Sequence, residues 1–288
     1  AGLRQQWYEV DQEQTSATAT CRGLVGVQCF SSNSEFLTPQ AAVIWEPSAT
    51  QHYYVSYSSS AKPPGVSVGN GDTVNDLTSQ LDPEENENIE AGARIALFGD
   101  RLQLQGAVFQ TKKENSKLYD VNGDLAETSG DSQEVTGVEL GVAGMITDAW
   151  SINASATFLD TETTFCEPPA PTVTDPDPVC ANLGKPIAFT PEQAASLWTT
   201  YNFTGALAGL EVGGGVTYQS EVFLNAANSG VAPSYTALDG LISYGWDRFR
   251  ISLNGYNLTG ELYFSQVHGN RVTPAQGRTF IATLGVVY

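Results

Sequence analysis

The sequence has little positive charge and no long apolar run, and each shortage excludes a class of protein. Its 288 residues include 13 lysines and arginines against 32 aspartates and glutamates, for a formal net charge of −19. A nucleic-acid-binding protein needs a basic patch to neutralise phosphates, and the sequence contains none, so nucleic acid is not an expected partner. A membrane-spanning helix needs roughly 20 consecutive apolar residues, which no segment provides.

Cysteine and histidine are also scarce, which restricts metal and redox chemistry. Cys21 and Cys29 lie close together in one polar segment, and Cys166 and Cys180 lie close together in another. Neither spacing is that of a C-x-x-C zinc site, so no metal ion or other cofactor is expected. Two local disulfides, one in each segment, are the most economical of the three possible connectivities, and they predict an oxidising compartment or the cell exterior. The alternative is four free thiols in a reducing compartment.

The spaced motifs of common enzymes are missing as well. The sequence contains no G-x-S-x-G, no H-E-x-x-H and no P-loop. Its two histidines, His52 and His268, restrict any serine–histidine catalysis. Alternation along a strand would place Ser265 and His268 on opposite faces. The sequence therefore predicts a protein that is not an enzyme.

What the sequence does contain is alternation of apolar and polar residues, the pattern of a β-strand with one face in a different environment from the other. Trp150, Ile152 and Ala154, for example, alternate with Ser151 and Asn153. Helical periodicity is nearly absent, so we expect an all-β protein. The expected strands are twelve, near residues 1–11, 36–46, 51–60, 86–98, 101–113, 133–147, 149–163, 188–204, 208–223, 233–246, 248–263 and 277–288.

The connections between these strands alternate between short and long. Short turns are expected at residues 47–50, 99–100, 147–148, 205–207 and 247. Longer polar loops are expected at 12–35, 61–85, 114–132 and 164–187, with smaller ones at 224–232 and 264–276. This rhythm is typical of a transmembrane antiparallel β-barrel of the outer membrane, with short periplasmic turns and long extracellular loops.

Aromatic residues gather beside the short turns. In an outer-membrane barrel such residues form a girdle at the membrane interface, because an aromatic ring there has one wet and one dry side. The residues expected in this girdle are Trp45, Phe98, Trp150, Tyr201, Phe203 and Trp246.

Several segments, in order along nearly the whole chain, resemble one family. The most specific are Leu81-Asp82-Pro83-Glu84 and Asn88-Ile89-Glu90-Ala91-Gly92-Ala93-Arg94. The others are TPQAAVIWEP at 38–47, YVSYS at 54–58, GVELGVAG at 137–144, NLT at 257–259 and GRT at 277–279. Together they resemble the TonB-dependent siderophore receptors of Gram-negative outer membranes, and they lean toward the catecholate-type branch. Thr136 and Tyr256 depart from the Arg and Asn often found at those places.

The resemblance implies an outer-membrane receptor that transports ferric siderophores with energy supplied through TonB. Members of the family carry a plug domain inside a 22-stranded barrel. Residues 1–288 would then be the C-terminal portion of the barrel, with the plug and the upstream strands outside this sequence. The implied partners are the TonB-ExbB-ExbD system, reached through the missing N-terminal region, outer-membrane lipid and lipopolysaccharide, and the transported ferric siderophore.

Two other readings of the sequence remain open at this stage. One is a self-contained twelve-stranded outer-membrane channel or autotransporter translocator, and the other is a secreted adhesion-type β protein. A receptor would need cations and flat aromatic faces in its long loops, because a ferric siderophore is usually anionic and rich in aromatic or hydroxamate groups. The candidate ligand-binding residues are Arg22, Lys62, Tyr119, Lys185, Tyr263, His268 and Arg271.

Overall fold

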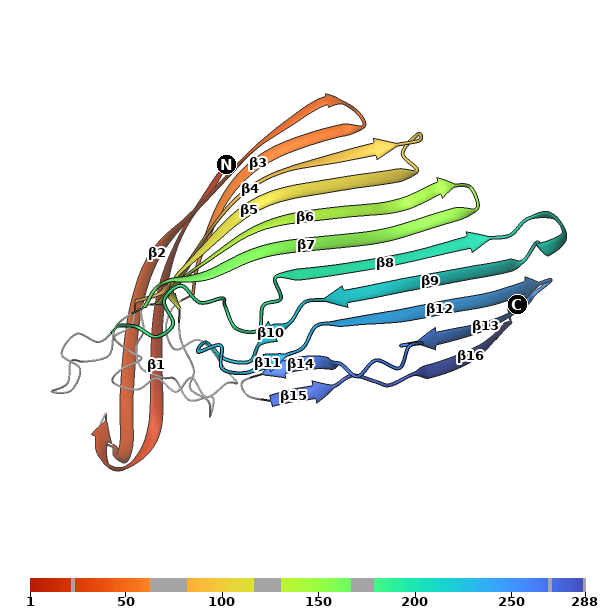
Figure 1. Ribbon diagram of the computed structural model, residues 1–288. Helices are drawn as coiled ribbons and strands as arrows, with labels where there is room; N and C mark the ends of the chain where they lie inside the picture. Colours follow the sequence, from red (N-terminus) through yellow and green to blue (C-terminus); the bar gives the residue numbers. More distant parts are fainter. Residues whose placement is uncertain (22–23, 63–81, 117–130, 167–178, 269–270, 287–288) are drawn as a thin grey trace.

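The chain forms one large antiparallel sheet. The computed structural model describes residues 1–21, 24–62, 82–116, 131–166, 179–268 and 271–286. Twelve strands pair in the order β1-β2-β3-β4-β5-β6-β7-β8-β9-β12-β13-β16 (Figure 1). Their bounds are β1 Gly2–Cys21, β2 Leu24–Ser48, β3 Gln51–Lys62, β4 Glu84–Leu97, β5 Leu102–Ser116, β6 Asp131–Thr147, β7 Trp150–Phe165, β8 Gln193–Asn202, β9 Leu210–Gln219, β12 Tyr235–Trp246, β13 Phe249–Tyr256 and β16 Thr279–Val286.

Two small sheets complete the secondary structure. Strands β10 (Val222–Phe223) and β11 (Val231–Ala232) pair with each other, and so do β14 (Phe264–His268) and β15 (Arg271–Pro274). A short 3-10 helix, η2 (Gly205–Leu207), lies between β8 and β9. Among the described residues, no helix is both long enough and apolar enough to cross a membrane.

The twelve predicted strands are confirmed in number and order, but several of their bounds were wrong. Most of the predicted loop at 12–35 is strand, because β1 and β2 continue to Cys21 and Leu24 and pair along their length. This segment is rich in threonine and valine, which favour extended backbone even without apolar alternation. Strand β8 begins at Gln193 rather than near 188, because Pro186 and Pro191 cannot donate ladder hydrogen bonds.

The last third of the chain shows two further differences from the prediction. Strand β9 ends at Gln219, and β13 ends at Tyr256, next to Asn257, whose φ of 49° lies in the left-handed region. The predicted connection at 264–276 contains the β14–β15 hairpin. These interruptions arise from single residues and local turns, which strand periodicity does not register.

The alternation of short and long connections is present in the structure. Figure 1 shows the β2–β3, β4–β5, β6–β7, β8–β9 and β12–β13 connections together at one end of the sheet. The longer connections, including the two small sheets, leave from the opposite end, which we call the rim. Strands β2 to β9, β12 and β13 therefore each join the short-turn end to the rim side.

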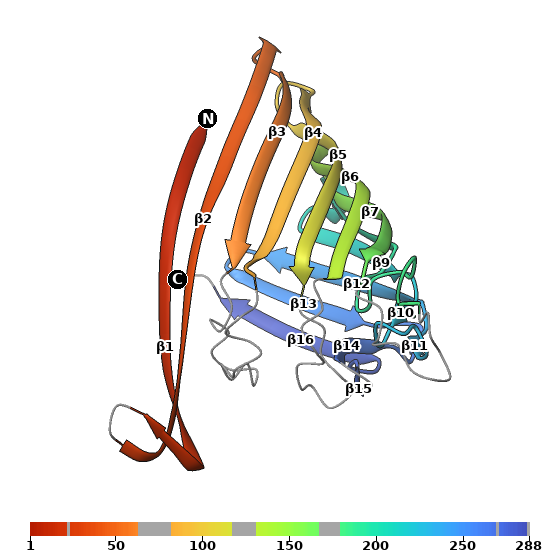
Figure 2. The same ribbon diagram turned by 90° about the vertical axis from the view of Figure 1, so that its left-hand side faces the viewer.

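The two faces of the sheet differ in chemistry. Residues directly opposite one another across six adjacent strands form an apolar row: Leu104, Val142, Ala154, Leu197, Val216 and Leu238. This apolar face is uncovered by the described chain: Val43 is 73% exposed and Leu284 is 65% exposed. The other face carries mainly polar and small residues. The sheet is strongly curved (Figure 2), and the polar face lines a hollow described below.

On the polar face, aromatic rings lie across glycines of the neighbouring strand. Phe109 stands opposite Gly137, and a Cβ at Gly137 would come 2.4 Å from the Phe109 ring. Trp198 stands opposite Gly215 in the same way, at 2.5 Å. Only glycine leaves space for the ring at these positions, so each pair fixes the register of two strands while filling the concave surface.

Candidate functional site

The polar face of β2 to β7 contains a hollow of about 450 Å³ lined partly by charged side chains, which come from β2 to β6. His52 Nδ1 lies 2.8 Å from Glu46 Oε1, which joins β3 to the end of β2. Arg94 on β4 stands directly opposite His52, and the Tyr54 hydroxyl donates to Glu90. These residues come from adjacent strands. They share a face because side chains alternate between the two faces along a strand, and each of these residues occupies a position that points to the polar face.

Glu139 extends this charged region to β6. It stands opposite Ala107 on β5 and Thr157 on β7, and it also lines the hollow. The hollow therefore holds three carboxylates, Glu46, Glu90 and Glu139, against the guanidinium of Arg94 and the imidazole of His52. A surface with this excess of acceptors suits a partner that brings hydrogen-bond donors.

From β7 to β16 the polar face carries hydroxyl groups instead. The Ser151 and Thr200 hydroxyls lie 2.5 Å apart, and those of Ser155 and Ser196 lie 2.9 Å apart. Near the short-turn end, Arg250 Nε donates to Ser243 Oγ at 2.8 Å, and its guanidinium also binds Glu211. This half thus carries one ion pair on its polar face, beside a buried serine.

At the rim, two connections are joined to one another. The β7–β8 connection returns beside the upper part of β7, where Thr163 N donates to Lys185 O and Gly184 N donates to Thr163 O, both at 2.9 Å. Farther along, Phe189 N donates to Phe223 O, in the β9–β12 connection, at 2.9 Å.

Another described part of the rim, at the β13–β16 connection, is organised around Asn257. This residue is 3% exposed, and its amide group donates to Glu261 O at 2.8 Å and to Gln276 O at 3.3 Å. Its backbone N–H donates to Asp239 on β12. Nearby, the rings of Tyr235 and Tyr263 stack with centroids 4.1 Å apart. Asn257 therefore ties the start and the end of the β13–β16 connection to the sheet.

Those predicted ligand-binding residues that the structure describes lie at one end of the molecule but not in one cluster. Lys62 ends β3, Arg271 begins β15 and is exposed, and His268 ends β14. Lys185 donates to Ala227 O at 3.0 Å, and Tyr263 stacks on Tyr235. Arg22 and Tyr119 lie outside the described residues. Within the described parts of the chain, no group of three or more His, Cys, Asp or Glu residues is placed to hold a metal ion.

The prediction from sequence missed Tyr235 and the charged residues of the hollow. Glu46 and His52 are six residues apart across one short turn, whereas Arg94 and Glu139 are more than 40 residues from them and from each other and join them only through the strand register. The signal available in the sequence was that each of these residues occupies a polar position in a strand of alternating apolar and polar residues, which places it on the polar face. Tyr235 was expected only as part of a strand.

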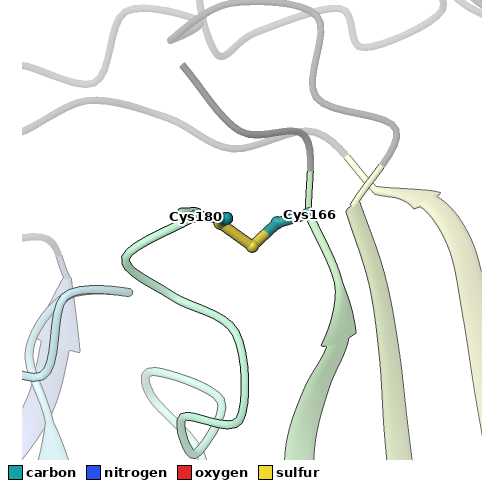
Figure 3. The surroundings of a disulfide bond; sticks show 2 residues. All are labelled: Cys166 and Cys180. Atoms are coloured by element: carbon teal, nitrogen blue, oxygen red, sulfur yellow. A yellow bond between two sulfur atoms is a disulfide. The ribbon is translucent and has the colours of Figure 1, made fainter. Parts of the chain in front are cut away.

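The cysteines behave as disulfides rather than free thiols where the structure describes them. Cys166 and Cys180 form a disulfide with a Cα–Cα distance of 6.0 Å at the rim (Figure 3). Cys29 is also disulfide-bonded. The side chain of Cys21, its predicted partner, lies outside the described residues.

Aromatic rings surround the short-turn end, as predicted. Trp45 and Tyr53 have ring centroids 5.3 Å apart, Tyr201 and Phe203 5.0 Å, and Trp246 and Phe249 5.8 Å. Trp45 and Phe98 are 63% and 57% exposed. Large exposed rings beside an exposed apolar face are the pattern of a membrane interface.

The family model of the TonB dependent receptor-like β-barrel matches residues 1–258. The chain belongs to this family. Its sheet is accordingly part of an outer-membrane receptor barrel, the apolar face is the lipid-facing outside, and the polar face is the lumen. The family consists of transport receptors, so the chain is not an enzyme, and the reading as a channel, a translocator or a secreted adhesion protein is not favoured.

Individual relatives agree with this assignment. The probable TonB-dependent siderophore receptor PiuA of Acinetobacter baumannii is 33% identical over 292 residues, covering 100% of this chain and 38% of the relative. Its crystal structure superposes with a TM-score of 0.81 at 30% identity, over 99% of this chain and 40% of that one. The catecholate siderophore receptor Fiu of Escherichia coli is 26% identical over 257 residues, covering 85% of this chain and 32% of the relative. The chain thus spans about a third to two fifths of these relatives.

Proposed function

We propose that this chain is the C-terminal portion of a TonB-dependent receptor that imports ferric siderophores. The observation that carries the proposal is the similarity to PiuA across the whole chain, in sequence and in fold. In this proposal residues 1–288 supply barrel wall and extracellular loops. The upstream strands and the plug domain belong to a part of the protein outside this sequence.

The open edges of the sheet support this division. Among the described strands, β1 pairs only with β2, and β16 pairs only with β13. A β-structure that spans a bilayer has to close, because an unpaired edge would leave backbone N–H and C=O groups in hydrocarbon. Further strands between β16 and β1 would complete the barrel, whereas a self-contained twelve-stranded channel would pair these two strands directly.

The polar lumen supports a plug. A water-filled or plugged interior requires polar inward-facing residues, and the hollow of β2 to β7 presents carboxylates that could accept hydrogen bonds from a folded domain. The plug region would also carry the contact to TonB and, through it, to ExbB and ExbD. On the outside, the apolar face would contact membrane lipid, and its rim end would lie near lipopolysaccharide.

The proposed cargo is an anionic ferric siderophore, with catecholates as the first class to test. Fiu is a catecholate siderophore receptor by name, and PiuA is a siderophore receptor. Lys62, Tyr263 and Arg271 are the described rim residues with the chemistry to meet such a ligand, as cations or as a flat phenol. Arg22, Tyr119 and His268 are candidates by residue type and position, and Lys185 is already engaged with a carbonyl.

Uptake of radioactive iron tests the proposal. The complete native receptor would be expressed in an iron-starved Gram-negative host lacking its own catecholate receptors, and the ferric complex of a tris-catecholate would be supplied. We expect uptake that disappears when TonB is deleted. Uptake that persists without TonB, or steady ion conductance of the purified receptor in a planar bilayer, would favour a passive channel instead.

A further inference from the structure

Two extracellular connections of this chain are joined to each other by hydrogen bonds. The first segment, residues 184–193, is the end of the β7–β8 connection together with Gln193, the first residue of β8, and the second segment, residues 220–232, belongs to the β9–β12 connection. We propose that these two segments form one rigid unit, in which Lys185 and Asn228 are positioning residues that make both connections respond to ligand as a single body. The ligand half of this statement rests on the proposed receptor function.

The first segment is fixed to the sheet along β7. Leu159 N donates to Glu192 O at 2.7 Å, and Thr163 N donates to Lys185 O at 2.9 Å. Ile187 N donates to the hydroxyl of Thr161, which is 4% exposed. Residues 184–193 therefore continue the ladder of the sheet irregularly, past the point where Pro186 and Pro191 prevent regular pairing.

The second segment is a closed turn with its own hydrogen bonds. Strands β10 and β11 pair through Val222 and Ala232, which are 3% and 5% exposed. Ser229 N donates to Asn225 Oδ1 at 3.1 Å, and Asn228 N donates to Asn225 O at 3.0 Å. Asn228 has a φ of 55°, a left-handed conformation that asparagine tolerates better than most residues.

Four residues of the first segment bond to the second. Phe189 N donates to Phe223 O at 2.9 Å, and Ser220 N donates to Gln193 O at 2.8 Å. Asn228 Nδ2 donates to Pro186 O at 3.1 Å, and Lys185 Nζ donates to Ala227 O at 3.0 Å. The two backbone bonds fix the base of the contact, and the two side-chain bonds fix its outer part, so the segments have little freedom to move separately.

Lys185 holds the two connections together, which differs from the ligand-binding role that its charge suggests. Its ammonium group caps a carbonyl in the turn of the other connection, and its own carbonyl oxygen accepts from β7. Lys185 thus joins three elements: β7, its own connection and the β9–β12 turn. Asn228 has the complementary position, because its amide bonds both to Pro186 O and to Asn225 O within its own turn.

Hydrogen–deuterium exchange on the complete receptor in detergent, without ligand, tests the coupling. Lys185→Met removes the ammonium donor, and Asn228→Gly removes the amide while keeping a residue suited to positive φ. Each variant is expected to raise exchange roughly three- to tenfold in both segments, because the loss of one net hydrogen bond shifts a local opening equilibrium by about that factor. Lys185→Arg keeps a donor and should restore the slow exchange.

A matched control removes a comparable bond elsewhere. Thr111→Val deletes the hydrogen bond from Thr111 Oγ1 to Asn88 Oδ1, 2.8 Å long, and should leave both segments unchanged. Faster exchange confined to the mutated connection would overturn the inference, as would an Asn228→Gly effect that stops at its own turn.

The ligand half has its own readout. Addition of the ferric tris-catecholate to the native receptor should slow exchange in both segments together, whereas slowing in one segment alone would overturn the coupled response. A receptor that binds no ferric siderophore of any class would instead contradict the proposed function, while the ligand-free exchange would still decide whether the two connections are coupled.

Discussion

The lumen wall of this chain has two halves that differ in how they are held. From β2 to β6 the wall is charged, with Glu46, Glu90, Arg94 and Glu139 around one hollow. From β7 to β16 it is mostly lined by hydroxyl groups, such as the Ser151–Thr200 pair at 2.5 Å. Charged groups hold a partner in one preferred geometry, whereas hydroxyls can both donate and accept and so exchange partners at small cost. A domain packed in this lumen would therefore be anchored on the first half and could slide along the second.

The largest effect is expected for a packing arrangement that both halves share, in which an aromatic ring lies across a glycine of the neighbouring strand. Gly137→Val places a branched side chain where the Phe109 ring and Leu159 already lie, with distances below 3 Å even for a Cβ. Overpacking alone typically costs about 1–3 kcal/mol, and the disturbed β5–β6 register adds to that cost, so the total is expected to exceed that of every other substitution discussed below. We expect strongly reduced assembly in the outer membrane, measured by heat-modifiable mobility on gels.

The matched control for this substitution is Gly277→Val. Nothing lies within 4 Å of a Cβ at Gly277, so assembly should remain normal. Equal loss of assembly in both variants would show that the rings on the concave face are not what makes Gly137 sensitive. Gly215→Val, below Trp198 in the hydroxyl half, should resemble Gly137→Val if this packing arrangement is common to both halves.

The next effect concerns the rim of the hydroxyl half. Asn257→Ala removes three side-chain hydrogen bonds to the main chain at a residue 3% exposed, and leaves alanine at a φ of 49°. The expected cost is about 2–4 kcal/mol, since buried carbonyl and amide groups lose their partner and the backbone is strained. The midpoint of thermal unfolding in detergent should fall by several degrees, whereas Asn153→Ala, at an exposed strand position, should hardly change it.

The strands of this protein could be predicted from sequence because alternation and turn residues are local signals. The alternation around Trp150, Ile152 and Ala154 identified β7 within a few residues. The length of the β1–β2 hairpin could not be predicted from sequence, because its outer part lacks regular apolar–polar alternation and was expected to be a polar loop. The strand boundaries near Pro191 and Asn257 were not predicted either, because one depends on a single missing N–H donor and the other on a single residue in the left-handed conformation.

The site was predictable only as a location. Alternating connections placed Lys62, Lys185 and Arg271 at one end, and the structure agrees. Their partners were not predictable, because the carbonyl that Lys185 binds belongs to a turn 42 residues away. The hollow was missed for a related reason: residues such as Arg94 and Glu139 come together through cross-strand register, which parity constrains but does not fix.

A smaller effect would test the two halves directly in the complete receptor. Arg94→Ala together with Glu139→Gln removes charge from the first half, and Ser151→Ala together with Thr200→Val removes a hydroxyl pair from the second, away from the hollow. If the plug is anchored on the charged half, the first pair should make the outer membrane leak a large glycopeptide antibiotic several-fold more than the second pair does. The measurement is the minimal inhibitory concentration in cells with matched receptor levels, and equal leakage would remove the distinction between anchored and sliding contacts.

The smallest effect is expected for the exposed hydrogen bond between His52 and Glu46 in the charged half. His52 and Glu46 lie 2.8 Å apart, but their side chains are 41% and 59% exposed. Water screens such a pair, so Glu46→Gln should change the free energy of unfolding by about 0–1 kcal/mol. Thermal unfolding of the variant and of the native receptor at low and high salt would measure it. A change comparable to that of Asn257→Ala would mean that another group, such as a plug residue, excludes water from this pair in the complete protein, and that the charged half is anchored at Glu46 itself.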